Sequence, residues 1–129
     1  MSLTTFKPTL KQKDVPVPSM GEGATIIVTE KTIANAMRLQ DLFKMLKDNG
    51  IEKTECFIAA MLVCTMKKPD GSYLLPKNDL DTINLVAYQT SDDVNSALYD
   101  AYLELNPTIE TEEIEGKKQT QLDAKKKKS

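Results

Sequence analysis

The feature that most constrains this chain is an uncharged run from Cys56 to Met66, in which Thr65 is the only polar residue. A surface helix needs one polar face, and this run has none, so as a helix it must be covered by other segments. It is too short to cross a bilayer, which takes about 20 residues. The run therefore predicts a buried central helix, about 54 to 67, with Lys67-Lys68 at its negative C-terminal end.

Length and composition allow one small domain with a modest core. The chain has 129 residues, of which 40% are hydrophobic and 5% aromatic, and it has no tryptophan, so we expect ordinary stability. Seventeen basic residues nearly balance 19 acidic ones, giving a formal net charge of -2. No overall field therefore attracts nucleic acid or an anionic membrane. Residues 1–7 lack the apolar block of a signal peptide, and a cytosol is the expected location.

The two cysteines, Cys56 and Cys64, are expected to be reduced core residues. Eight residues of α-helix place them about 12 Å apart along the axis, which is too far for a disulfide, and free cysteine is usually buried. The sequence contains no histidine and no CxxC motif. A conventional zinc site is therefore unsupported, a histidine acid–base site is excluded, and we expect neither a metal nor a cofactor.

The N-terminal part is expected to be extended. Residues 1–23 carry three prolines, and the alternation in Val15-Pro16-Val17-Pro18 favours an arm without a full ladder of hydrogen bonds. Residues 24–29 are rich in β-branched side chains, which predicts one strand, with part of the arm as a candidate partner or edge strand. Such a hairpin would be marginal alone, so it must dock on the helices.

A further helix is expected before the central one, over about 30 to 48. Thr29 is its candidate N-cap, and apolar residues recur behind it at helical spacing. Asn49-Gly50 would end it with a left-handed cap. After the central helix, Pro69-Asp70-Gly71 has the residues of a turn, and a short extended connector, 72–76, follows.

Two shorter helices are expected after that connector. Asn78 as N-cap, with an acidic residue three positions later, predicts a helix over about 79 to 88. The next helix has its cap either at Ser91 or at Thr90, which also has an acidic residue three positions later. Its apolar stripe keeps helical spacing until Pro107 stops it.

Beyond Pro107 the apolar pattern is lost and the charges segregate. Four glutamates between positions 110 and 115 precede six lysines, so 107–129 has almost nothing to bury and is expected to be disordered. It is either a solvating tail or a partner-binding segment. The expected fold is thus mainly α: an extended arm (1–23), then a small bundle of about four helices around a buried central helix, with a short N-terminal β element (24–106), and a disordered C-terminal tail.

No catalytic motif is present. The sequence has no GxxxxGK[ST], no GxGxxG, no nucleophile elbow and no HExxH. Capping explains the carboxylates near the helix starts, which are Asp79, Asp81, Asp92 and Asp93. The methionines could form an adaptable binding surface, although core filling explains most of them. We expect a binding protein rather than an enzyme.

Two kinds of binding protein fit these residues. One is a helical module that holds an aggregation-prone partner through exposed apolar side chains and a flexible tail. The other is a structural subunit whose proline-rich arm docks on a neighbour. The first predicts a monomer or a small oligomer, and the second predicts regular self-assembly; the periodicity does not choose between them.

The order of these features resembles a known family. An arm, a short strand, a helix and the apolar helix 56–66 are followed by the Pro-Asp-Gly-Ser-Tyr-Leu-Leu turn at 69–75, the capped Asn78-Asp79 helix, and the segment 96–106 that leads into a charged tail. Over about residues 6–118 this arrangement is similar to the tail assembly chaperones of long-tailed bacteriophages, the family that includes the lambda G protein. The most specific pieces are the Asp-Gly turn and the Glu104-Leu105-Asn106 ending.

The resemblance implies a non-enzymatic factor of the infected bacterial cytoplasm that is absent from the mature virion. It would bind the phage tape measure protein and help to recruit tail tube protein, with neither nucleic acid nor a membrane as partner, and self-association is left open. A tape measure is a long helical protein with much apolar surface, which methionine and leucine side chains could cover by helix-in-groove contacts. A very long, helix-rich reading frame immediately downstream is the expected neighbouring gene.

Aromatic and methionine side chains dominate interfaces, and they define a candidate contact face. Its residues are Met37, Phe43, Tyr73, Leu74, Tyr99 and Tyr102. Phe43 and Tyr102 lie on apolar stripes, so the core is the better guess for these two.

Two alternatives remain beside the chaperone. One is a minor structural subunit of a phage tail or a similar assembly, and a more distant one is a nucleic-acid binder that uses the lysine tail. The family resemblance also bears on the lysine runs at 117–118 and 125–128. In many relatives a ribosomal frameshift near the C-terminus makes a longer product, and slippery codons could encode these runs; a solvated tail is the other explanation.

Overall fold

The computed structural model describes residues 6–107, and these contain four α-helices and a three-stranded sheet. The predictions of a mainly α chain, about four helices and a short β element are confirmed. The tail prediction for 107–129 lies, except for Pro107, outside the described residues. Within the described part, no helix combines the length and the apolarity that a membrane crossing would need.

The sheet has the order β1-β2-β3 and is antiparallel throughout. Strand β1 (Gln12–Pro16) pairs with β2 (Thr25–Thr29), so a part of the expected arm is an edge strand. A 3₁₀ turn, η2 (Pro18–Met20), connects the two strands. The following Gly21 has φ 140°, a conformation open only to glycine, and this lets the chain reverse towards β2.

Helix α1 (Ile33–Asp48) begins later than expected. Thr29, the expected N-cap, belongs to β2, and the hydroxyl of Thr32 instead accepts a hydrogen bond from the Asn35 N–H at 3.1 Å. The end agrees with the prediction. Gly50 has φ 68°, and the N–H of Ile51 donates to the Leu46 carbonyl at 2.9 Å, which is the Schellman form of a left-handed cap.

Helix α2 (Thr54–Thr65) contacts α1, α3, α4 and β2. The expectation that Lys67-Lys68 cap this helix is wrong, because Met66 has extended torsions and Met66–Lys67 form the short strand β3. Met66 lies opposite Val28 in the sheet, and both are buried. The pairing with β2 therefore competes with a further helical turn and prevails. The buried residues of α2 are Cys56, Ala59, Ala60, Leu62, Val63, Cys64 and Thr65.

Two capped helices complete the fold. The N-cap of α3 (Leu80–Gln89) is Asp79 rather than the expected Asn78, because the Asp79 carboxylate accepts from the Thr82 N–H at 2.8 Å. Ser91, one of the two expected alternatives, caps α4 (Asp92–Leu105). The turn after β3 is also as expected, with Gly71 at φ 89° and its N–H bonded to the Lys68 carbonyl.

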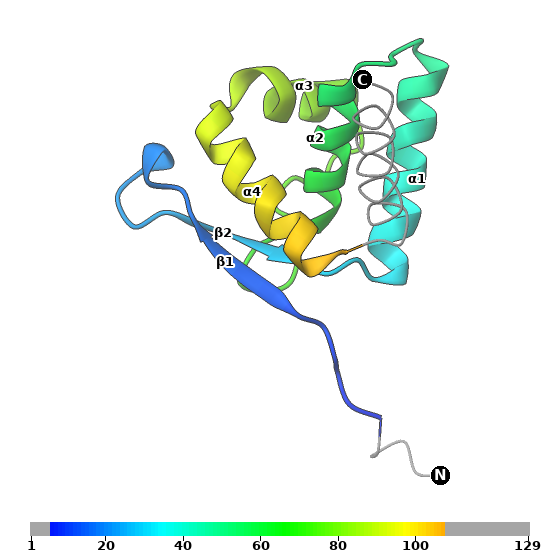
Figure 1. Ribbon diagram of the computed structural model, residues 1–129. Helices are drawn as coiled ribbons and strands as arrows, with labels where there is room; N and C mark the ends of the chain where they lie inside the picture. Colours follow the sequence, from blue (N-terminus) through cyan, green and yellow to red (C-terminus); the bar gives the residue numbers. More distant parts are fainter. Residues whose placement is uncertain (1–5, 108–129) are drawn as a thin grey trace, which may run out of the picture.

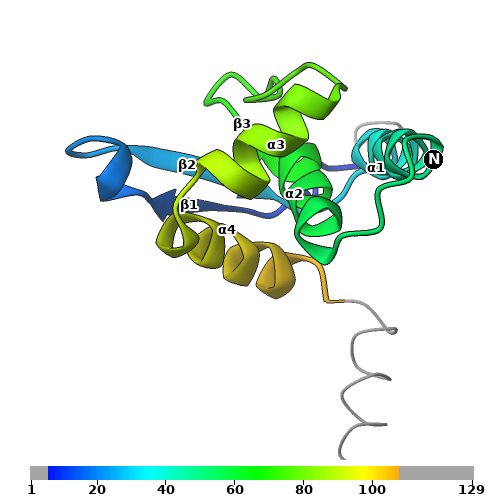
Figure 2. The same cartoon turned by 90° about the horizontal axis from the view of Figure 1, so that it is seen from above.

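The helices gather on one side of the sheet, where α4 lies along β1 and β2 (Figure 1). In the perpendicular view α2 lies between α1 and the α3–α4 pair (Figure 2). The residues with almost no exposed surface come from all of these elements. They include Val28, Leu42, Leu46, Leu62, Val63, Ile83 and Leu98.

Candidate protein-binding groove

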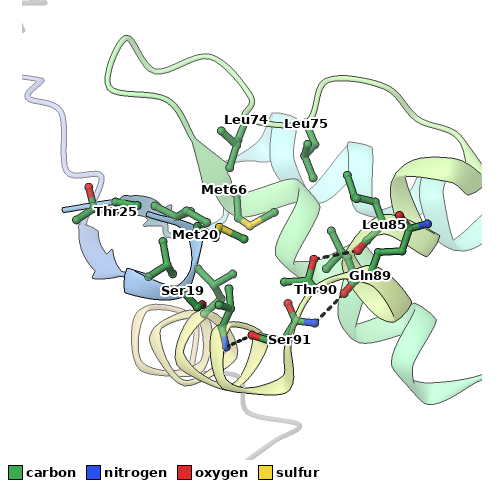
Figure 3. A pocket seen from close by; sticks show the side chains of 17 residues that line it. Ser19, Met20, Thr25, Met66, Leu74, Leu75, Leu85, Gln89, Thr90 and Ser91 are labelled. Atoms are coloured by element: carbon green, nitrogen blue, oxygen red, sulfur yellow. Dashed lines mark hydrogen bonds between the residues drawn. The ribbon is translucent and has the colours of Figure 1, made fainter. Parts of the chain in front are cut away.

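An open apolar groove of about 480 Å³ lies between the turn end of the hairpin and the corner where α3 meets α4. In Figure 3, Met20 borders it from the hairpin, Leu74 and Leu75 from the connector after β3, and Leu85 from α3. The residues that line it are Val17, Ser19, Met20, Ala24, Thr25, Ile26, Met66, Leu74, Leu75, Leu85, Val86, Gln89, Thr90, Ser91, Val94, Asn95 and Leu98.

Local structure holds the walls in place. The Val17 N–H donates to the Ala24 carbonyl at 2.9 Å and closes the hairpin end. At the α3–α4 corner, the Thr90 hydroxyl donates to the Leu85 carbonyl at 2.9 Å, and Ser91 caps α4. The helix corner and the hairpin end are thus separately fixed, and the space between them stays open.

The groove has an apolar floor and an exposed apolar rim. Val17, Met66 and Leu98 are buried in the floor, whereas Met20 is 53% exposed and Leu85 41% exposed at the rim. No charged side chain is among its lining residues. Exposed methionine and leucine beside a concave apolar surface are typical of a protein-binding site.

One buried polar atom in the lining has no partner. Among the described residues, Oδ1 of Asn95 is the buried side-chain atom for which no hydrogen bond is found. Its amide orientation is fixed, because Nδ2 donates to the Val86 carbonyl at 2.7 Å. Since a buried acceptor without a partner is costly, a ligand N–H that reached this oxygen would be favoured.

The lining has no acid, base or thiol that could transfer a proton or attack a substrate at neutral pH. Within residues 6–107 there is also no group of three or more side chains arranged to hold a metal ion. Burial raises the pKa of the Cys64 thiol to about 11, and this thiol lies in the core rather than in the groove. The geometry of the groove therefore supports binding of apolar surface.

The structure does not bring the six candidate contact residues onto one face. Leu74 lines the groove, whereas Met37, 61% exposed, lies on α1. Phe43 is partly buried against Phe57, with ring centroids 5.5 Å apart in an edge-to-face arrangement.

The three tyrosines of that set also lie apart from the groove. The Tyr73 hydroxyl donates to Oδ1 of Asn35 at 2.9 Å, which fixes the ring on α1. Tyr99 is partly buried, with its ring 6.2 Å from that of Tyr102. Tyr102 is only 4% exposed, so it belongs to the core, which its place on an apolar stripe favoured. Burial raises the pKa of Tyr102 to about 12.

Sequence reasoning missed the role of Arg38, the only arginine in the chain. It is 6% exposed, donates from Nε to Oδ1 of Asn78 at 2.6 Å and from a terminal nitrogen to the Val63 carbonyl at 3.1 Å. Its guanidinium carbon also lies 4.3 Å from the centre of the Tyr73 ring. The ammonium nitrogen of Lys67 lies 3.5 Å from the same ring centre. Burial lowers the pKa of both cations. The signal in the sequence that could have indicated this role is that Arg38 is a single arginine among many lysines.

The rim of the groove was missed as well. Leu85 lies off the apolar stripe of its own helix, and Met20 stands in a turn beside Gly21. An apolar residue in either place is a signal for a contact outside the chain's own core. Sequence spacing could not show that the two residues face the same space.

Comparisons with known proteins identify no relative: no family model, no curated protein and no solved structure matches this chain.

Proposed function

We propose that this chain is a non-enzymatic tail assembly chaperone of a long-tailed phage, which holds apolar helical segments of the tape measure protein in the groove between the hairpin and the α3–α4 corner. The observation that carries the proposal is the apolar, uncharged lining with Met20 and Leu85 exposed at its rim. A holding protein needs such a surface, and it needs no catalytic group.

The chemistry of the lining suits a client with varied apolar side chains. Met20 and Met66 can change rotamer at little cost, so one groove can accept leucine, isoleucine or phenylalanine at successive contacts. Each large apolar side chain that is fully buried contributes about 1.5–3 kcal/mol. A few such contacts support binding that is strong enough to protect a client and weak enough to release it.

In this proposal α2 serves as the enclosed central rod, around which α1, α3, α4 and the sheet are arranged. Its contacts with all of these elements support that role. The charged tail 107–129 would keep the client complex soluble in the host cytoplasm, and recruitment of the tail tube protein would follow on the loaded tape measure.

Co-expression with the tape measure protein tests the proposal. We expect the two proteins to co-purify and the tape measure to precipitate without this chain. Leu85→Glu places a charge at the rim and should reduce co-purification at least about 10-fold. Leu103→Glu is the matched control, since Leu103 is an exposed leucine on α4 that does not line the groove. Equal recovery with both variants would rule out the groove as the client site.

A minor structural subunit of a phage tail is the second candidate, favoured by the exposed arm that precedes β1. The two candidate functions differ in whether the protein stays in the virion and in how far it self-assembles. A structural subunit would remain in purified virions and assemble without limit, whereas a chaperone would be absent from virions and stop at a small oligomer. Mass spectrometry of purified virions, together with gel filtration at several concentrations, separates them.

A further inference from the structure

The arm at residues 6–11 carries apolar side chains that its own domain does not cover. Phe6 is 87% exposed and Leu10 49% exposed. Lys11 is tied to the domain, because its N–H donates to the Glu30 carboxylate at 3.0 Å and its carbonyl accepts from the Glu30 N–H at 3.0 Å. Within the described residues, no hydrogen bond involves positions 6–10. The arm therefore has apolar side chains and backbone hydrogen-bonding groups that are available for contact with another molecule.

The arm is amphipathic at the period of an extended chain. Side chains of an extended backbone alternate between two faces, so Phe6, Pro8 and Leu10 share one face, and the intervening polar residues share the other. In β1 the odd-numbered Val15 is buried against the helices, while its even-numbered neighbours are exposed. All of residues 6–11 are exposed, so the domain does not cover the apolar face of the arm.

The groove complements the arm in charge as well as in polarity. Its lining is uncharged, but Glu22 follows the rim residue Met20 closely in the hairpin turn, and Asp92 and Asp93 follow Ser91 at the start of α4. The polar face of the arm carries two lysines, Lys7 and Lys11, and no acid. If the apolar face of the arm lay in the groove, its lysines would therefore lie near the acidic residues at the edges of the groove.

The arm cannot fill the groove of its own copy. It leaves the hairpin at the start of β1, whereas the groove is at the turn end, and the strand between them spans roughly 17 Å. Figure 1 shows the arm running away from the domain at the end opposite η2. The only arm that can enter the groove without unpairing β1 is therefore that of another copy.

We propose that residues 6–11 of one copy dock in the groove of a second copy, with Phe6 and Leu10 as anchors. Two copies related by a two-fold axis, with antiparallel hairpins, bring each arm to the partner's groove and give a closed dimer. The exchanged arms cover the groove until another apolar segment displaces them. This self-association does not depend on the identity of the client, so it goes beyond the function proposed above.

Light scattering after gel filtration of the full chain tests the proposal. The wild-type chain should dimerise with increasing concentration. Phe6→Ser combined with Leu10→Ser removes the arm anchors, and Leu85→Glu alters the groove; each should weaken dimerisation at least about 10-fold. Thr9→Ser, on the polar face of the arm, is the matched arm control and should dimerise. Unchanged urea midpoints show that each variant is folded.

Mixing the two defective variants makes the test specific. The arm variant keeps an intact groove, and the Leu85→Glu variant keeps an intact arm, so a one-to-one mixture should form heterodimers through one arm and one groove. A wild-type chain that stays monomeric at the highest concentration, dimers that survive loss of the arm anchors, or a mixture that stays monomeric would overturn the proposal. The arm variant should still bind the tape measure protein, because its groove is intact. Failure of the proposed function can therefore be distinguished from failure of the dimer proposal.

Discussion

The backbone N–H of Lys31 donates a 2.6 Å hydrogen bond to Oδ1 of Asn106, which lies 75 residues later in the chain. The Asn106 amide also donates to the carbonyls of Tyr102 at 3.0 Å and Thr29 at 3.3 Å. One buried side chain therefore joins the end of α4 to the connection between β2 and α1. This contact closes the domain at the point where the described chain ends.

Asn106→Ala should destabilise the fold. The substitution removes a partner from the Lys31 N–H and from the Thr29 carbonyl, and unsatisfied buried polar groups cost about 1–3 kcal/mol. Urea unfolding followed by circular dichroism measures the change. Asn84→Ala, at an exposed position on α3, is the control and should change the free energy of unfolding little. Equal stability of the two variants would show that the Asn106 contacts contribute nothing net.

Arg38→Lys should also cost about 1–3 kcal/mol, although it conserves the charge. One ammonium group cannot reach both Asn78 and the Val63 carbonyl in the geometry that the planar guanidinium uses. The connector before α3 should loosen first, because it loses its bond to α1. Urea unfolding gives the size of the effect, and hydrogen exchange at residues 74–78 locates it. Lys44→Arg on the exposed side of α1 is the control, and a loss as large in that variant would refute the argument.

Local rules were sufficient where one segment determines its own structure. Asn49-Gly50 ended α1 as expected, and Ser91, one of the two expected alternatives, capped α4, because a left-handed glycine and a side-chain cap depend only on adjacent residues. Pairing between distant segments overrode the same rules elsewhere. Thr29 and Lys67 were assigned to helix ends, but both belong to strands that meet only in the folded chain.

The candidate site was less predictable than the fold, for the same reason. Met20 and Leu85 are separated by more than 60 residues of sequence, and only the folded hairpin and helix corner bring them to one rim. Residue type alone made Tyr102 a candidate contact residue, whereas its place on an apolar stripe favoured the core, where the structure has it.

The capping carboxylate of Asp79 should make stability depend on pH. Hydrogen bonding to Thr82, through its side chain and its N–H, lowers the pKa of Asp79 below the ordinary value of 3.8. A carboxyl whose pKa is lower in the folded state stabilises the fold above its unfolded pKa, and this contribution is lost as the pH falls through the folded pKa. Asp79→Asn keeps a good cap without the titration. It should therefore lose less stability than the wild type between pH 6 and pH 3.

Thermal unfolding at a series of pH values measures that difference. Asp41→Asn, at an exposed position within α1, is the control, and it should follow the wild-type profile. If Asp79→Asn shows the same acid dependence as the wild type, the Asp79 carboxylate does not contribute to it.

The thiol of Cys64 should be unreactive in the native protein and should report on opening of the core. Cys64 has no exposed surface, and burial raises its pKa to about 11, so little thiolate exists at pH 8 and no reagent reaches it. A disulfide reagent should label Ser96→Cys, on the exposed side of α4, within its mixing time, while Cys64 reacts only through opening. Arg38→Lys should speed labelling of Cys64 about 10-fold for each 1.4 kcal/mol of stability lost, because the rate follows the population of the open form when opening and closing are faster than labelling. Native Cys64 that reacts as fast as the introduced cysteine would mean that the core at the end of α2 is open.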